Sequence, residues 1–379
     1  MGDIFKAGLV GGRSDCSLLP FLHRMFGRYE YRLYGLSDGE FPDFLRHGDF
    51  DALNVADPFR RTAATLCDTL SPLAERIGAV NTVIRTADGA LHGENTDYAG
   101  FKKMVSVLGV PMKGRRCAVF GRGGAAAAVK AVLEDLGARE VLLLARGEQP
   151  PRMIEVIVNA TPVGSAPDTD KALCDPADHP ACAAVFDLVC NPEETKLMRL
   201  AFLAGVPRLG GLVMLAAQAK AAAALFLKPA KLPHNIYLYG PPGCGKTHYA
   251  RALAPALGMK YVDLDLEIEK AAGKSVADIF AENGEAEFRI IEKNVLRRIA
   301  CDSTQIVALG GGALLDAGSL KLARMTGRIA VPDWDELTLI RRLAADPIRR
   351  PLLAHDLVGR LSELLCVRAE HYQAVVQEG

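Results

Sequence analysis

One stretch decides the fold of the C-terminal part of the chain: Asn235-Ile236-Tyr237-Leu238-Tyr239-Gly240-Pro241-Pro242-Gly243-Cys244-Gly245-Lys246-Thr247. Its apolar start predicts a buried β-strand, and the residues from Gly240 onward match the pattern GxxxxGK[ST] in full. Gly240, Gly243 and Gly245 allow backbone N–H groups to close around phosphate oxygens at a helix N-terminus. Lys246 can then reach the β- and γ-phosphates of ATP, and Thr247 can ligate Mg²⁺. The stretch therefore predicts an ATP-binding P-loop in a parallel α/β sheet.

The composition of the whole chain limits what else it can be. Its 379 residues are 50% hydrophobic and 24% charged, which is typical of a packed protein of two or three domains. Because 45 basic residues balance 45 acidic ones, nucleic-acid binding is not expected. We see neither a membrane-length apolar run nor a signal peptide, so we expect a cytoplasmic protein without membrane partners. The nine cysteines form no CxxC pair, which favours free thiols over a zinc site.

Charged and glycine-rich segments follow the P-loop in an ordered series. Asp263 and Asp265 come at an expected strand end, where one carboxylate can serve the metal and the other an acceptor hydroxyl. The later segments are Gly284-Glu285-Ala286-Glu287-Phe288-Arg289, Glu292, Gly310-Gly311-Gly312, Arg349-Arg350-Pro351-Leu352-Leu353, Arg368 and Tyr372. Any one of these is more often a solvated charge or a turn, so the information lies in their order and spacing.

In this order the segments resemble shikimate kinase, over residues 235–379. The resemblance implies an adenylate-kinase-like P-loop domain that uses ATP and Mg²⁺ to phosphorylate the 3-hydroxyl of shikimate. It implies that Asp265 deprotonates the hydroxyl, that Lys246 and a mobile Arg350 act on the phosphates, and that Thr247 and Asp263 support the metal. The shikimate-binding residues that it implies are Asp265, Arg289, Gly310, Gly311, Gly312 and Arg368. That family usually adds a strand after the helix of Tyr372, so one sheet edge is expected to lack a neighbour.

The residues before position 229 alternate between strand and helix patterns, which indicates an α/β architecture. The expected strands are 7–10, 117–120, 141–145, 156–158 and 185–189, and the expected helices are 125–136 and 211–227. The segment Gly121-Arg122-Gly123-Gly124-Ala125-Ala126 lies between a strand and a helix. Alone this GxGGxA pattern is a weak dinucleotide signal, and its context strengthens it.

Five further segments agree with that turn: Ile77-Gly78-Ala79-Val80-Asn81-Thr82, Gly93-Glu94-Asn95-Thr96-Asp97, Val158-Asn159-Ala160-Thr161-Pro162-Val163-Gly164, Asp187-Leu188-Val189-Cys190-Asn191-Pro192 and Gly211-Leu212-Val213-Met214-Leu215-Ala216-Ala217-Gln218. Together they resemble shikimate dehydrogenase, over residues 7–227. The resemblance implies reduction of 3-dehydroshikimate by NADPH, which makes the substrate of the kinase. The residues that it implies at the substrate are Ser17, Asn81, Asp97 and Gln218, and those at NADP are Gly121, Gly123, Gly124, Ala125 and Arg146.

The N-terminal part departs from the dehydrogenase pattern where the chemistry takes place. Arg60 replaces the lysine that works beside Asp97 in that family. A lysine can be tuned to protonate the developing alkoxide, whereas arginine, with a pKa above about 12, keeps its proton. Leu19, Ala56 and Cys190 replace a serine, a threonine and a tyrosine. Arg60 and Asp97 are therefore the predicted catalytic pair, with Arg60 restricted to stabilising negative charge.

The cofactor-binding part is also short. Residues 146–152, which follow the expected strand 141–145, span at most about 23 Å. Returning along one strand and across two strand spacings needs roughly 20 Å, so a helical crossover does not fit. We therefore expect a Rossmann unit that lacks its outer strand and part of its adenosine side. Arg146 in this segment can face a 2′-phosphate, so NADP(H) is the dinucleotide expected of an active dehydrogenase.

These observations predict a substrate-binding domain at 1–104 with a returning helix at 211–228, a truncated NADP-binding Rossmann domain at 105–210, a linker at 229–234 and a kinase domain at 235–379. Two readings of function remain open. In one the chain is a fully bifunctional enzyme, and in the other it is a kinase with a non-catalytic binding or scaffold module. The departures favour the second reading for turnover. A nucleotide switch explains neither the paired aspartates nor the two arginines. Beyond small-molecule substrates, the sequence leaves oligomeric state and channelling open.

Overall fold

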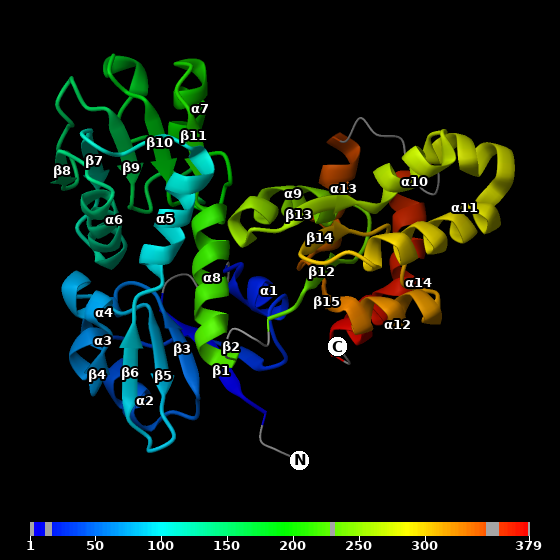
Figure 1. Ribbon diagram of the computed structural model, residues 1–379, viewed down its shortest axis with the longest axis horizontal. Helices are drawn as coiled ribbons and strands as arrows, with labels where there is room; N and C mark the ends of the chain where they lie inside the picture. Colours follow the sequence, from blue (N-terminus) through cyan, green and yellow to red (C-terminus); the bar gives the residue numbers. More distant parts are fainter. Residues whose placement is uncertain (1–3, 12–16, 228–231, 346–355, 378–379) are drawn as a thin grey trace. The chain divides into compact units, whose positions relative to one another are not determined.

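The structure is a computed structural model that describes residues 4–11, 17–227, 232–345 and 356–377 (Figure 1). The chain divides into two compact units, Met1–Leu22 with Tyr29–Ala230 and His23–Arg28 with Lys231–Gly379. The units contain three β-sheets with parallel strands and connecting helices, so the expected α/β class is confirmed. The finer domain boundaries stay predictions.

A six-stranded mixed sheet forms the first part of the N-terminal unit, in the order β2-β1-β3-β5-β6-β4. Its strands are β1 (Lys6–Val10), β2 (Glu30–Tyr34), β3 (Ala52–Val55), β4 (Thr69–Leu70), β5 (Thr82–Arg85) and β6 (Leu91–Glu94). Its helices are α1 (Leu19–Arg24), α2 (Phe41–His47), α3 (Arg60–Leu66) and α4 (Pro72–Ile77). All four residues of β3 are buried, whereas β2 at the sheet edge has none that is fully buried, as expected of an inner and an outer strand.

Five parallel strands form the second sheet of this unit, in the order β11-β10-β9-β7-β8. They are β7 (Arg116–Phe120), β8 (Glu140–Leu144), β9 (Val156–Asn159), β10 (Ala184–Asp187) and β11 (Arg208–Gly210). The helices are α5 (Asp97–Leu108), α6 (Gly124–Asp135), α7 (Lys196–Leu203) and α8 (Leu212–Leu227), with a 3₁₀ turn at Pro176–Asp178. Residues 145–155 are all described and contain only turns and irregular structure, so β8 is an edge strand without a helical crossover, as the sequence predicted.

Several strand boundaries differ from the expectation by one residue, and one differs by two. The strand expected at 185–189 ends at Asp187. There the Asp187 carboxylate accepts a hydrogen bond from the backbone N–H of Val189 at 3.1 Å, which turns the chain out of the sheet. This turn directs Cys190 and Asn191 toward a cavity that is described below.

The C-terminal unit contains a four-stranded parallel sheet, in the order β13-β14-β12-β15. The strands are β12 (Asn235–Leu238), β13 (Lys260–Asp263), β14 (Gln305–Ala308) and β15 (Gly327–Ala330). The helices are α9 (Lys246–Leu257), α10 (Leu264–Ala272), α11 (Val276–Ala300), α12 (Ala317–Thr326), α13 (Glu336–Ala345) and α14 (Leu357–Gln377). Tyr237, Tyr239 and Tyr372 are among the largest side chains in its core. The helix that carries Arg289 is kinked at Gly284, whose φ is 77°.

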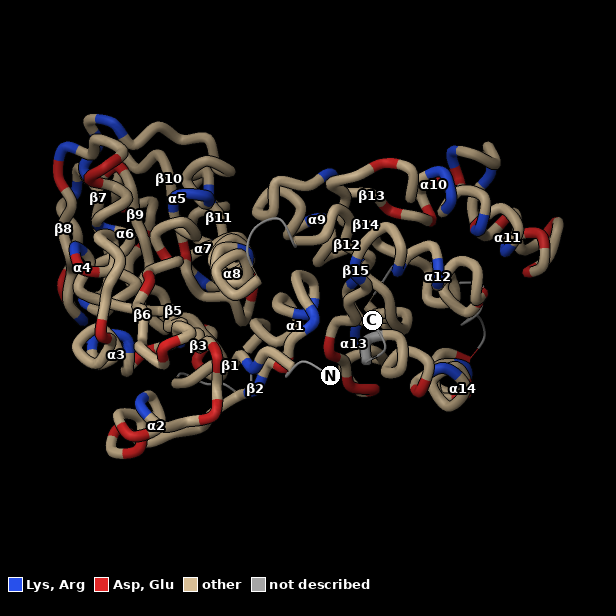
Figure 2. Tube along the Cα trace, turned by 60° about the horizontal axis from the view of Figure 1, so that its bottom comes forward, with Lys and Arg blue, Asp and Glu red and all other residues tan. Residues whose placement is uncertain are grey.

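Basic and acidic residues are interspersed along the described chain in both units (Figure 2). This distribution agrees with the balanced composition. Among the described helices, none combines the length and the apolar character that crossing a bilayer requires.

A close helix contact joins the two sheets of the N-terminal unit. Helices α5 and α8 lie side by side (Figure 1), and they are in tight contact at Gly100. A β-carbon at Gly100 would lie 2.9 Å from both Cγ and the carbonyl oxygen of Met214 on α8. Because α8 carries Gln218, this contact also sets the position of a predicted substrate-binding side chain.

We expect Gly100→Val to lower the free energy of unfolding of the N-terminal unit by about 1–3 kcal/mol, because the added carbons overpack the contact with Met214. Urea unfolding followed by circular dichroism measures this loss. The sole tryptophan, Trp334, reports separately on the C-terminal unit. Gly39→Ala is the control, because no atom lies within 4 Å of its added carbon, and its change should stay within about 0.5 kcal/mol. Equal effects of the two substitutions would contradict the proposed role of the contact.

Candidate functional site

The P-loop connects β12 to α9. Its three pattern glycines, Gly240, Gly243 and Gly245, have φ values of 136°, 81° and 92°, which other residues adopt only with strain. Lys246 is buried at the start of α9, and its ammonium group donates to the carbonyl oxygens of Gly240 and Pro241, both at 2.9 Å. The loop therefore has the backbone shape and the central cation of a nucleotide phosphate site.

Asp263 links the P-loop to the next strand. It ends β13, and its Oδ2 accepts a hydrogen bond from the Thr247 hydroxyl at 2.9 Å. Its Oδ1 accepts from the backbone N–H of Asp265 at 3.1 Å and so caps α10. The structure thus brings the two predicted metal ligands together and places Asp265 on the adjoining helical turn. One hydroxyl and one carboxylate beside a phosphate site fit Mg²⁺, which binds few protein ligands and keeps phosphate oxygens and waters.

The glycine turn after β14 gathers the remaining predicted acceptor residues. A β-carbon at Gly310 would lie 2.8 Å from Oε1 of Glu292 and 3.4 Å from Oδ1 of Asp265. A β-carbon at Gly312 would lie 2.6 Å from Nη2 of Arg289. Glycine is needed here because charged side chains approach the backbone, and this approach brings Asp265 and Arg289 to one place.

Helix α14 reaches the same turn. The Tyr372 hydroxyl donates to the carbonyl oxygen of Gly311 at 2.7 Å. Burial raises the pKa of Tyr372 to about 12, and the nearby positive charge of Arg368 acts in the opposite direction. The structure thus places Arg368 near the glycine turn, as predicted. Arg350 lies outside the described residues, so its expected role on the phosphates stays a prediction.

Glu292 is a site residue that the sequence analysis did not assign. It is 3% exposed, and its Oε2 accepts from Nη1 of Arg289 at 2.7 Å. Burial raises its pKa, and Arg289 opposes that rise. Within the described chain, Oε1 of Glu292 has no hydrogen-bond partner and lies beside Gly310. The three-residue spacing from Arg289 on a helix was the available signal.

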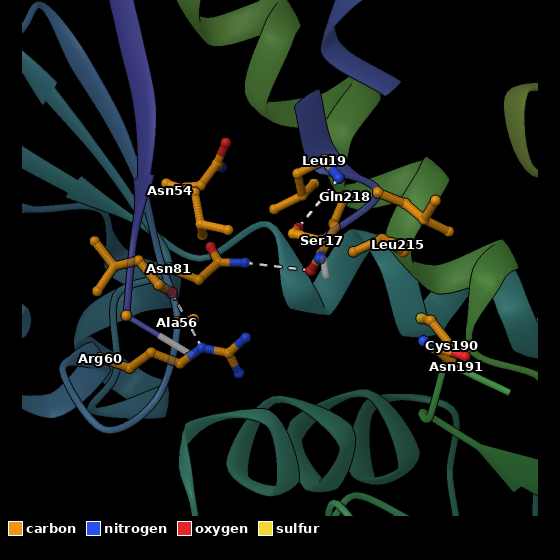
Figure 3. A pocket seen from close by; sticks show the side chains of 14 residues that line it. Ser17, Leu19, Asn54, Ala56, Arg60, Asn81, Cys190, Asn191, Leu215 and Gln218 are labelled. Atoms are coloured by element: carbon orange, nitrogen blue, oxygen red, sulfur yellow. Dashed lines mark hydrogen bonds between the residues drawn. The ribbon is translucent and has the colours of Figure 1, made fainter. Parts of the chain in front are cut away.

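A cavity of about 230 Å³ lies in the N-terminal unit (Figure 3). The predicted residues Ser17, Asn81, Gln218 and Arg60 line it, and Asn81 Nδ2 donates to Gln218 Oε1 at 3.5 Å. Asp97 begins α5, is 1% exposed and does not line the cavity. The structure therefore gathers the predicted polar side chains around one small-molecule pocket, with Asp97 behind its wall.

The three residues that depart from the dehydrogenase pattern also line this cavity. Leu19, Ala56 and Cys190 present apolar or weakly polar surface to it (Figure 3). Burial raises the pKa of Cys190 to about 12, so its thiol stays protonated at neutral pH. Asn54 and Asn191, which the sequence analysis did not assign, add amide groups to the lining. The pocket thus retains hydrogen-bonding amides and has lost hydroxyls.

An ion pair occupies the expected catalytic position. Nη1 of Arg60 lies 2.8 Å from Oδ2 of Asp97, and Nε of Arg60 donates to the carbonyl oxygen of Val55 at 3.2 Å. Burial raises the pKa of Asp97, the charge of Arg60 lowers it, and Asp57 raises it further. The guanidinium is thus fixed between a carboxylate and a carbonyl oxygen, at the edge of the substrate cavity.

The predicted dinucleotide residues form the turn between β7 and α6. Gly121 has a φ of 117°, Gly123 is the N-cap of α6, and Gly124 and Ala125 begin the helix. Arg146 follows β8 and lines a second cavity of about 450 Å³, which lies beside the carboxyl ends of β7 and β8. Ligands of parallel α/β sheets bind at this edge, so the placement matches the expected cofactor side.

Asp187, at the end of β10, forms hydrogen bonds that connect β9 with the segment leading to the cavity. This fully buried carboxylate accepts from Thr195 Oγ1 at 2.6 Å and from Asn159 Nδ2 at 2.9 Å. Burial raises its pKa to about 6, against the lowering effect of these hydrogen bonds. Because Asp187 also holds the N–H of Val189, it orders the segment that brings Cys190 to the pocket.

The geometry defines two classes of protein in one chain. One is a P-loop phosphotransferase, and the other is an α/β dehydrogenase-like unit with a small cavity. The chain belongs to the shikimate kinase family in its C-terminal part and to the shikimate dehydrogenase family in its N-terminal part. The family model of shikimate kinase matches residues 242–377, and that of the shikimate dehydrogenase substrate binding domain matches residues 27–83.

Individual relatives agree with both assignments. A shikimate dehydrogenase (NADP(+)) of Pelodictyon phaeoclathratiforme is 32% identical, over 56% of this chain and 88% of its own length. A shikimate kinase of Symbiobacterium thermophilum is 42% identical, over 36% of this chain and 80% of its own length. The crystal structure of a Thermus thermophilus shikimate 5-dehydrogenase in complex with NADP(H) and shikimate is similar with a TM-score of 0.52 and 30% identity, over 59% of this chain and 94% of that one.

We expect Asp187→Asn to become more stable relative to the unmodified protein as pH rises. The folded-state pKa of Asp187, about 6, exceeds its ordinary value of 3.8, so its contribution is fully present below that value and is lost as pH rises through 6. Between pH 4.5 and 7.5 the difference in unfolding free energy should shift by about 2 kcal/mol in favour of the variant. Urea unfolding at both pH values measures it. A difference that does not change with pH would show that Asp187 does not titrate in this way.

Proposed function

We propose that the C-terminal unit phosphorylates shikimate with the residues described above, while the N-terminal unit binds a shikimate-like ligand and reduces 3-dehydroshikimate slowly or not at all. The observation that supports slow or absent reduction by the N-terminal unit is the ion pair between Arg60 and Asp97. The chain is thus a shikimate-pathway protein that joins a kinase to a dehydrogenase-like region of reduced activity.

In the kinase reaction, Asp265 accepts the proton of the acceptor hydroxyl. Its support is the position of this carboxylate beside Gly310, on the first turn of α10. Arg289 and Arg368 pair with the carboxylate of shikimate, because guanidinium groups bind carboxylates through paired hydrogen bonds. Glu292 orients Arg289 through the 2.7 Å contact.

ATP and Mg²⁺ fit the phosphate side of this site. The N–H groups of the glycine loop and the Lys246 ammonium suit the β- and γ-phosphates, and Thr247 and Asp263 suit the metal. Mg²⁺ supplies neutralisation of charge on the phosphate oxygens. The residues of this chain thus bind, orient and remove one proton, and no covalent intermediate is needed.

Among the described residues, the pair of Arg60 and Asp97 offers no general acid for ketone reduction at the cavity. The alkoxide that forms must be protonated, and a guanidinium group is a poor general acid for that step. Asp97 is buried behind Arg60 and paired with it, so it is not exposed to the cavity. Stabilisation of negative charge by Arg60 remains, and it does not replace proton transfer.

Full bifunctionality is the second candidate function. It is favoured by Asn81 and Gln218, which line the cavity together, and by the retained Asp97 next to a cationic side chain. In that case Arg60 alone would have to support reduction at the rate of the kinase step.

Two assays on the purified full chain separate these candidates: ADP release with shikimate, and NADPH oxidation with 3-dehydroshikimate. Lys246→Ala is the control for the first assay, since it removes the cation of the P-loop. Absence of shikimate-dependent ADP release from the unmodified protein would refute the kinase proposal.

We expect Asp265→Asn to lower kcat for phosphoryl transfer by about 10²–10⁴-fold, because the acceptor hydroxyl loses its base. ATP·Mg²⁺ binding should be nearly unchanged, since Asp263 contacts Thr247 and Asp265 does not cap α10. Steady-state kinetics and nucleotide titration measure the two quantities. Asp263→Asn is the matched variant, and it should weaken ATP·Mg²⁺ binding instead. The opposite pattern in the two variants would reverse the assigned roles.

We expect NADPH oxidation by the unmodified protein to be at least about a hundredfold slower than ADP release, because general acid catalysis contributes about 10²–10⁴-fold. Arg60→Lys alone should recover little of this rate, since Ala56 and Leu19 remain in the cavity and each missing hydroxyl costs about 1 kcal/mol of hydrogen bonding. Absorbance at 340 nm follows the reaction. Reduction by the unmodified protein at the rate of its kinase step would establish the bifunctional alternative.

A further inference from the structure

A carboxylate lies against the dinucleotide turn of the N-terminal unit. A β-carbon at Gly123 would lie 3.8 Å from both carboxylate oxygens of Asp57. A β-carbon at Gly124 would lie 3.0 Å from Cδ of Arg60, so the start of α3 packs directly on the turn. Oδ2 of Asp57 is 3.7 Å from Nη1 of Arg60, and the same nitrogen lies 2.8 Å from Oδ2 of Asp97. Asp57 therefore places a negative charge at the start of α6.

A second carboxylate, that of Glu148, is paired with Arg122, the cation of the same turn. Nη2 of Arg122 donates to both oxygens of Glu148 at 3.2 Å, and Glu148 also accepts from the N–H of Ala145 at 2.6 Å. The carbonyl oxygen of Arg122 accepts from Nη2 of Arg61 at 2.8 Å. The turn is thus held by protein groups on two sides, and its guanidinium is already paired with an anion.

These contacts disfavour the binding of a dinucleotide, although the shape of the turn suits one. A dinucleotide places its pyrophosphate at the N-terminus of such a helix, where N–H groups and the helix dipole favour an anion. A carboxylate a few ångströms away repels that anion. Of the other cations, Arg146 lies at the end of β8, on the adenosine side of the turn, and Arg61 donates to the carbonyl oxygen of Arg122. The surroundings of Gly123 therefore do not fit a dinucleotide well.

We propose that the charge of Asp57 lowers the affinity of the N-terminal unit for NADP(H), so that the neighbouring cavity takes its polyhydroxy ligand without the dinucleotide. The inference rests on the proposed function, in which this unit binds a shikimate-like molecule but does not reduce it at a useful rate. Asp57 does not line the cavity itself, although it lies 3.7 Å from Arg60, which does.

Titration of the full chain with NADPH, followed by ligand fluorescence, tests the proposal. Asp57→Asn preserves the shape of the side chain and removes its charge, and Asp57→Ala removes both. Each variant should bind NADPH at least about tenfold more tightly than the unmodified protein, which is 1.4 kcal/mol. This gain in NADPH affinity should become smaller as the salt concentration rises, because the Asp57 side chain is 57% exposed and its charge is screened. Asp38→Ala, which removes an exposed carboxylate before α2, should leave NADPH affinity unchanged.

Kinase turnover of the Asp57 variants should match the unmodified protein, and urea unfolding followed by circular dichroism should show that their N-terminal unit is folded. An unchanged NADPH affinity in Asp57→Asn overturns the proposal, as does a gain that appears only in Asp57→Ala. The proposed function fails separately, through reduction of 3-dehydroshikimate by the unmodified protein at the rate of its kinase step. Since Arg60 is still present in Asp57→Asn, tighter NADPH binding should not restore reduction.

Discussion

The carboxyl ends of parallel strands meet at one edge of a sheet, and the chemistry of both units depends on this constraint. In the C-terminal unit, β12 ends at the P-loop, β13 at Asp263 and β14 at the glycine turn. In the N-terminal unit, β7 ends at Gly121 and β8 is followed by Arg146. Loops at this edge must let a phosphate or a charged side chain approach the backbone. Gly240 is therefore required because its φ is 136°. Gly312 is required because Arg289 occupies the space that a β-carbon would need.

Features encoded by neighbouring residues could be predicted from the sequence. The strand expected at 235–239 is found as Asn235–Leu238, and the turn glycines lie where the motifs placed them, because periodicity and turn chemistry are local properties. Contacts between distant segments could not be predicted in this way. The approach of Asp57 to Gly123 joins residues 66 positions apart, and it results from the packing of α3 on the turn. Likewise, the Glu292 oxygen that has no hydrogen-bond partner among the described residues could be found only in the structure, where β14 brings Gly310 beside α11.

The ion pair between Arg60 and Asp97 has a chemical consequence greater than its contribution to stability. Burying two charges costs several kcal/mol per ion, which their attraction repays only with good geometry. Burial raises the pKa of Asp97 even though Arg60 opposes the change, so desolvation is the stronger effect at this carboxyl. Arginine in place of lysine preserves this pairing, because both are cations, but a guanidinium group is a much weaker acid than an ammonium group. The fold of the pocket can therefore persist while its acid–base chemistry is lost.

The short connection after β8 and the carboxylate of Asp57 act on the same ligand by independent means. The connection leaves β8 as an edge strand and removes the surface that a helix and a further strand would give to the adenosine side. Asp57 adds charge at the pyrophosphate side. Neither feature touches the lining that Asn81 and Gln218 give to the substrate cavity. The cavity has also changed, because Leu19, Ala56 and Cys190 stand where the resemblance implies hydroxyl groups, but it keeps its amide groups. A cavity that keeps amides beside an altered dinucleotide side is what we expect of a unit that binds a small polar ligand.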